Sequence, residues 1–196
     1  MAPFSATVYF DLLPWESLFY IGIIMAILII FSLLLRALRR GPKRPPRLRL
    51  LLLAVAVVLI LIPLFSFDNF LQRLQAGHER NIAETSETPR FPELQTRTYP
   101  APPDQVYDAA RNAISKQRGW LLTASDRQRG ELQVEVQVPP LLGIFTDDLH
   151  ITISAAGEGQ TRVEARSRSR VGRGDLGENR RHILQFFYAL DEQLGR

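Results

Sequence analysis

Two long apolar runs dominate the first third of the chain. Residues 18–35 and 50–67 are each 18 residues long and contain no charged side chain. At about 1.5 Å per residue, a helix of that length covers roughly 27 Å, close to the ~30 Å hydrocarbon core of a bilayer. Aromatic residues stand near the outer ends of both runs, as they do at membrane interfaces. The pattern predicts two transmembrane helices.

The pattern changes to short alternating segments in the second half of the chain. In residues 131–138 every second residue is apolar, which is typical of a strand with one buried face. Such a face must be covered, and two segments with apolar residues at helical spacing are available to cover it. We therefore predict a two-layer α+β domain, a mainly antiparallel sheet with two helices on one face. The expected elements are an extended piece at 95–99, a helix between Pro102 and Gly119, strands at 120–125, 131–138, 149–153 and 160–171, and a helix at 178–194.

The segment between the second apolar run and this domain has a weaker pattern. Residues 68–83 are consistent with a helix that carries Phe70, Leu71 and Leu74 on one side. This helix either lies along the membrane surface or extends the second span, and both alternatives stay open. Residues 84–94 are polar and contain two prolines, as linkers do. We expect a juxtamembrane segment and linker over residues 68–90 and the folded domain over residues 91–196.

The charge distribution predicts an orientation in the membrane. Residues 36–49, between the two runs, hold seven Lys or Arg and no acid, whereas the whole chain carries a net charge of only +4. Because Lys and Arg are retained on the cytoplasmic side, this loop should be cytoplasmic. Residues 1–17 and the domain then lie on the other side, as in a multi-pass protein of the bacterial inner membrane with a periplasmic domain. Since the excess charge belongs to the loop, it gives no reason to expect nucleic-acid binding.

Candidate groups for catalysis are scarce. The chain has no cysteine, which excludes disulfides, thiolate nucleophiles and cysteine-based zinc sites. Neither a metalloprotease motif nor a nucleophile elbow is present. Asp148 and His150 share a strand face and could offer two metal ligands, but no third ligand stands at a recognisable spacing. We expect no metal site, no cofactor and no catalytic residue.

The densest polar pattern lies where the last strand meets the last helix. Alternating arginines, glycines and a helix start together offer forked donors, close backbone approach and free N–H groups for a carboxylate or phosphate. In the structural alternative, the arginines pair with acids on neighbouring strands, and Asp175 or Asn179 caps the helix. The candidate anion-binding residues are Arg166, Arg168, Arg170, Gly172, Arg173, Asp175, Gly177 and Asn179.

The loop at residues 139–145, PPLLGIF, is unusually apolar. It either folds back over the core or contacts a partner or the membrane, and both alternatives stay open. The candidate contact residues are Leu141, Leu142, Ile144 and Phe145.

These two segments resemble a family of bacterial and plastid proteins, the domain of unknown function 1499 (DUF1499). The resemblance covers roughly residues 91–194 and leaves the two apolar runs as an added anchor. No activity is implied by the family. The residues that carry the resemblance are Gly143, Phe145, Asp147, Asp148, Arg166, Ser167, Ser169, Arg170, Gly172, Asp175, Gly177, Asn179, Ile183 and Phe186.

Recognition residues without catalytic residues favour a binding or accessory module over an enzyme. The leading hypothesis is a periplasmic module that contacts a membrane-protein partner. The alternative is a binder of a phospholipid or another anionic small molecule. A second alternative is an uncharacterised metal-dependent enzyme, whose acid-base or metal groups would be Asp147, Asp148, His150 and Asp175.

Overall fold

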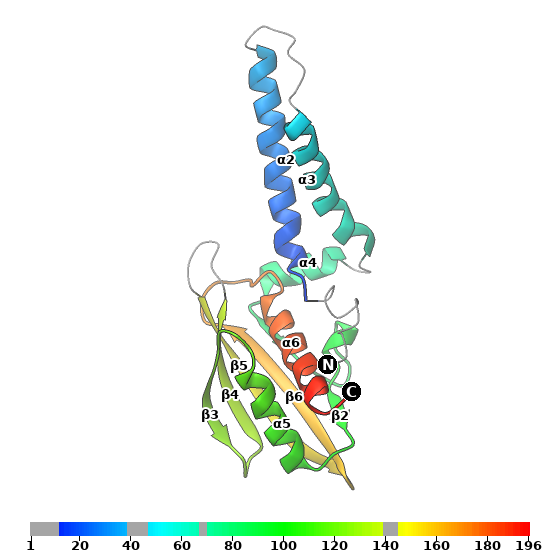
Figure 1. The fold of residues 1–196 in the computed structure, drawn as a ribbon, viewed down its shortest axis with the longest axis vertical. Coiled ribbons are helices and arrows are strands. Elements are labelled where there is room, and N and C mark those ends of the chain that lie inside the picture. Colours follow the sequence, from blue (N-terminus) through cyan, green and yellow to red (C-terminus); the bar gives the residue numbers. More distant parts are fainter. Residues whose placement is uncertain (1–11, 39–46, 67–69, 139–144) are drawn as a thin grey trace. The chain divides into compact units, whose positions relative to one another are not determined.

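The computed structural model describes residues 12–38, 47–66, 70–138 and 145–196. The chain forms two compact units, one of residues Pro14–Gly77 and one that contains His78–Arg196. The first unit holds the apolar helices and the second holds the sheet (Figure 1).

Two apolar helices make up most of the first unit. They are α2 (Trp15–Leu38) and α3 (Arg47–Ser66), and both are long and apolar enough to cross a membrane. In the most apolar stretches of α2 and α3, only 17% and 11% of the residues are buried. A core helix of a soluble domain would be mostly buried by the surrounding protein. The two predicted runs fall on these helices, while Phe67 and residues 39–46 of the basic loop lie outside the described residues.

Small residues set the spacing between α2 and α3. A Cβ added at Gly22 would lie 3.0 Å from the Ala56 carbonyl oxygen and 3.1 Å from Ile60 Cγ1. Ala56 itself is fully buried. Small residues let helix backbones approach closely, which is how apolar helices gain contact in a bilayer.

A third helix, α4 (Phe70–Glu79), follows α3. Its first residue packs on the beginning of α2, where the ring centroids of Phe19 and Phe70 lie 5.4 Å apart in an edge-to-face arrangement. The helix ends at Glu79, four residues before the expected position 83, because Ile82 and Ala83 enter the sheet instead.

The second unit is an antiparallel sheet with two helices on one face (Figure 1). The strand order is β1-β6-β5-β4-β3, and β2 also pairs with β6. The helices are α5 (Pro103–Ser115) and α6 (Glu178–Gln193). This arrangement confirms the predicted α+β fold class. The strands are β1 (Ile82–Glu84), β2 (Arg97–Tyr99), β3 (Trp120–Asp126), β4 (Glu131–Val138), β5 (Phe145–Gly157) and β6 (Gln160–Ser169).

The alternating pattern decides which face of the sheet is buried. In β4, Leu132, Val134 and Val136 are each at most 2% exposed, whereas the residues between them point away from the helices. Partners from α5 and α6 complete one continuous core, as expected from their apolar stripes. The helix residues in that core include Val106, Ala110, Ile114, Ile183, Phe186, Phe187 and Leu190.

The sheet begins earlier in the chain than the sequence pattern indicated. β1 pairs with β6 through Ile82 opposite Arg168, and Leu94 from the expected linker is buried in the core. Residues 82–84 lack periodicity because a three-residue strand is too short to show one. Their partner lies more than 80 residues away, so no local signal marks the pairing.

Candidate functional site

The start of β5, the end of β6 and the start of α6 meet at one end of the sheet. In the register, Val136, Asp147 and Ser169 form one row on the helix-covered face. Asp147 is 3% exposed and Ser169 is 7% exposed. Buried polar groups need partners, so this row is where a polar network is required.

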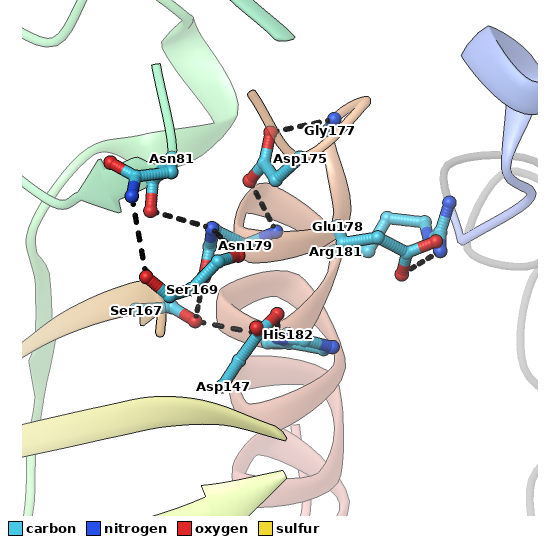
Figure 2. A network of polar contacts seen from close by, with 10 residues as sticks. All are labelled: Asn81, Asp147, Ser167, Ser169, Asp175, Gly177, Glu178, Asn179, Arg181 and His182. Atoms are coloured by element: carbon cyan, nitrogen blue, oxygen red, sulfur yellow. Dashed lines mark hydrogen bonds and ion pairs between the residues drawn. The ribbon is translucent and has the colours of Figure 1, made fainter. Parts of the chain in front are cut away.

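Asn179 is the centre of that network (Figure 2). Its Oδ1 accepts a 2.6 Å hydrogen bond from Ser167 Oγ. Its Nδ2 donates to Ser169 Oγ and to the Asn81 carbonyl oxygen, each at 2.9 Å. One amide therefore ties α6 to β6 and to the residue that precedes β1, with both of its amide hydrogens and its oxygen in use.

His182 and Asp147 extend the network toward β5. His182 Nδ1 lies 3.3 Å from Ser167 Oγ and 3.6 Å from Asp147 Oδ2. Since Ser167 donates its proton to Asn179, its oxygen is free to accept one from His182 Nδ1–H. The Trp120 and His182 rings pack in a T-shaped arrangement, with centroids 6.4 Å apart.

This Ser–His–Asp cluster does not have the geometry of a catalytic triad. In a triad the serine and the acid contact opposite ring nitrogens, so that a proton can pass through the imidazole. Here Ser167 and Asp147 both approach Nδ1, and Ser167 is fully buried. The arrangement holds α6 on the sheet and does not activate the serine.

Burial shifts both titratable groups of the cluster. It raises the pKa of Asp147 to about 6; a hydrogen bond from Ser169 opposes this, and the charges of Asp175 and Glu178 add to it. Burial also lowers the pKa of His182 to about 3, with a further contribution from the Arg181 charge. The imidazole is therefore neutral at pH 7.

Asp175 caps α6, which was one of the two alternatives for this residue. Its carboxylate accepts hydrogen bonds from the backbone N–H of Gly177 at 3.0 Å and of Asn179 at 2.9 Å. Gly177 has φ 81°, a left-handed conformation that a glycine adopts without strain. Leu176 before it also has a positive φ, 51°, so the turn is tightly constrained. The turn is therefore built to start the helix.

The arginines of β6, and Arg170 just after it, lie on the opposite face of the sheet, and most of them have acidic partners. Arg170 donates to Asp148 at 2.6 Å and to Glu135 at 2.5 Å. Arg166 Nε lies 3.4 Å from Glu84 Oε2. Cross-strand charge pairs therefore account for these two arginines.

Two arginines of the predicted anion-binding set, Arg168 and Arg173, have no acidic partner among the described residues. Arg168 stands opposite Asp148 in the register, but that carboxylate bonds to Arg170. Arg173 is exposed in the turn beside Gly172. Of the predicted anion-binding set, these two are the groups still available to a ligand or partner.

An apolar rim, Val138, Phe145 and Val171, borders the same end of the sheet. Val138 and Phe145 are cross-strand partners, and Phe145 is 45% exposed. Val171, two residues beyond the end of β6, is 67% exposed. The predicted contact residues Leu141, Leu142 and Ile144 lie outside the described residues.

The structure separates the groups considered for metal chemistry. Asp147 points to the helix-covered face, whereas Asp148 and His150 lie on the other face, opposite Arg168 and Arg166. Within the described ranges no three His, Cys, Asp or Glu side chains gather in a way that could hold a metal ion.

A shallow hollow of about 380 Å³ lies between α5 and β3. Arg111, Asn112 and Trp120 are among its lining residues. None of the predicted site residues that the structure describes lines it, so it adds nothing to that site.

Sequence reasoning missed the network, although it named several of its members (Figure 2), Asp175 and Asn179 as anion-binding candidates and Asp147 as an acid-base candidate. In residues 160–171, Val163 and Ala165 alternate with charged residues, and this alternation places Ser167 and Ser169 on the inward face. A hydroxyl on a core face signals a buried partner. Asn81, Asp147 and His182 come from three other segments, and no spacing within the sequence links them to those serines.

Comparison with known proteins gives a family and no activity. No curated protein matches the chain. A solved structure, TTHA0849 from Thermus thermophilus, aligns at 10% identity over 58% of this chain and 96% of that chain, with a TM-score of 0.33. A family profile described as "Protein of unknown function (DUF1499)" matches residues 71–190, more than half of the chain. The chain belongs to the DUF1499 family.

Proposed function

We propose that this chain is a two-span protein of the bacterial inner membrane whose periplasmic DUF1499 domain is a binding module for a membrane-protein partner. The apolar rim is the observation that carries the proposal. Phe145 and Val171 remain exposed at an end of the sheet where the core itself is closed. Exposed apolar side chains with an exposed arginine nearby, here Arg173 two residues after Val171, match the aromatic and arginine enrichment of protein interfaces.

The buried network gives this rim a fixed position. Asn81 Nδ2 donates to the backbone carbonyl oxygens of Ser169, at 3.3 Å, and of Gly172, at 3.1 Å. Those two bonds fix the backbone on both sides of Val171. A rigid contact surface loses little conformational entropy on binding, which favours recognition of one partner.

A protein partner fits the charge distribution better than a lipid headgroup does. Three of the four outward-facing arginines in and just after β6, Arg162, Arg166 and Arg170, pair with acidic side chains, so the outer face of the sheet has little net positive charge. Binding to anionic lipid draws on several uncompensated cations at once. Two isolated arginines are better suited to individual acidic side chains of a protein.

Photocrosslinking in intact cells tests this proposal. A photoreactive residue at Phe145 or at Val171 should capture one recurring membrane protein, identified by affinity mass spectrometry. The control position is Glu158, in the turn at the opposite end of β5 and β6. The same capture profile from all three positions would contradict a specific interface at the rim.

A phospholipid or another anionic small molecule is the second candidate, because Arg168 and Arg173 have no acidic partner among the described residues. Lipid captured at the rim without any protein would favour this candidate. Native mass spectrometry of the intact chain should then show bound phospholipid that is lost when both arginines are replaced by glutamine.

A further inference from the structure

The position of α4 is restricted by its short connection to α3. Only residues 67–69 separate Ser66 from Phe70, so the two Cα atoms are at most about 15 Å apart. Phe70 is 3% exposed and packs on Phe19 near the beginning of α2. The start of α4 is thus held at the ends of the two apolar helices.

The apolar face of α4 is wider than its contact with α2. At 100° per residue, Phe70, Leu74 and Leu71 form one continuous apolar arc, and Gln72 lies on the opposite side. Phe70 fills the contact with α2, whereas Leu71 at the far edge of the arc is 67% exposed. An apolar side chain therefore projects from the helix at the level where the apolar helices end.

We propose that α4 lies in the membrane interface and inserts Leu71 among the acyl chains of the bilayer that holds α2 and α3. The inference rests on the proposed membrane spans. A short helix with one apolar face and a polar back is the form that interfacial helices take. The Phe19–Phe70 contact sets its depth, and lipid then covers the part of the arc that α2 does not.

Site-directed spin labelling of the full chain in proteoliposomes tests the inference. The chain has no cysteine, so single substitutions can be labelled without removing native thiols. The variants are Leu71→Cys, its neighbour Gln72→Cys on the polar side, and Val57→Cys on an exposed position of α3. Power saturation with oxygen, which partitions into lipid, and with a water-soluble nickel chelate reports the surroundings of each label.

At position 71 we expect oxygen to relax the spin label more strongly than the nickel chelate does. At position 72 we expect the nickel chelate to relax the label more strongly than oxygen does. A label at position 71 as accessible to nickel as position 72, or shielded from both reagents, would overturn the inference. The label at position 57 separates this failure from a failure of the spans. If the nickel chelate also reaches the label at position 57, the proposed membrane spans are wrong. The proposal that α4 lies in the membrane interface then fails as well.

Discussion

Asn179 is the residue on which the buried network depends most. Replacing it with alanine removes one hydrogen bond from each of three groups, the Ser167 hydroxyl, the Ser169 hydroxyl and the Asn81 carbonyl oxygen. A buried hydrogen bond contributes about 0.5–1.5 kcal/mol, so we expect the loss of these three bonds in Asn179→Ala to destabilise the domain by roughly 3 kcal/mol. Hydrogen exchange of the β6 and α6 amides in the full chain measures this loss. Asn112→Ala, at an exposed position of α5, is the control and should leave exchange unchanged.

The pair of Asp147 and His182 should give opposite pH dependences when either member is removed. Asp147 has its pKa raised to about 6 from an unfolded value near 4, so its contribution to stability is present below pH 4 and lost as the pH rises to 6. His182 has its pKa lowered to about 3 from an unfolded value near 6.5, so its contribution is present above pH 6.5 and lost as the pH falls. Between pH 4 and 6 the two effects oppose each other in the native chain.

Single variants separate these effects. Asp147→Asn leaves only the histidine, and the free energy of unfolding should increase with pH between 4 and 6. His182→Gln leaves only the carboxyl group, and stability should decrease over the same interval. Each slope should approach but not exceed about 1.4 kcal/mol per pH unit, measured by hydrogen exchange at several pH values. Equal slopes in both variants would contradict the assignment.

At the residue scale, sequence reasoning predicted which face of the sheet a side chain lies on better than it predicted which residues that side chain contacts. Alternation indicated which side chains of β4 face inward, because that depends only on the backbone period of two. It could not indicate that Asp147 faces His182, since residues from β5 and α6 meet only after the sheet and helix have packed. The alternative in which the arginines pair with acids on neighbouring strands also depended on the strand register, which the sequence does not reveal. The antiparallel pairing of β4, β5 and β6 supplies it and brings Arg170 to its two acids.

At the element scale, Gly22 should control the packing of α2 on α3. Gly22→Val adds a Cβ about 3 Å from the Ala56 carbonyl oxygen and from Leu59 Cβ, with two methyl groups beyond it, so the helices must separate or tilt. We expect a loss of roughly 1–3 kcal/mol in the stability of the helix pair, measured by unfolding in mixed micelles of mild detergent and dodecyl sulfate. Ile27→Val, at a 59% exposed position of the same helix, is the matched control. Equal effects of the two substitutions would show that Gly22 is not a contact point.

Elements with long, strong patterns were predicted well, and short ones were not. The apolar helices, β4, β6 and α6 each carry several repeats of their own period. β1 has three residues and is stabilised entirely by β6, so its strand state depends on tertiary pairing. Residues 85–94, after β1, have the polar composition of a linker. Leu94 at their end is nevertheless buried in the hydrophobic core.

At the scale of the whole molecule, the basic loop predicts a topology that can be measured directly. In intact cells whose outer membrane has been made permeable, a membrane-impermeant maleimide should label Glu158→Cys in the β5–β6 turn but not Gly41→Cys in the loop. The absence of native cysteine makes the unmodified chain the background control. Labelling of the loop alone would reverse the expected orientation, and labelling of both would contradict a loop on the cytoplasmic side.

The pairing of β1 with β6 has a consequence for any release of the domain from its anchor. A cut in residues 85–90 would take β1 and Asn81 away with the apolar helices. The edge of β6 at residues 166–168 would then be bare, and bare edges recruit strands from other copies. Proteolytic shedding at this stretch would therefore yield a damaged, self-associating fragment in place of a soluble form of the domain. Only a cut before Asn81 would release the domain intact.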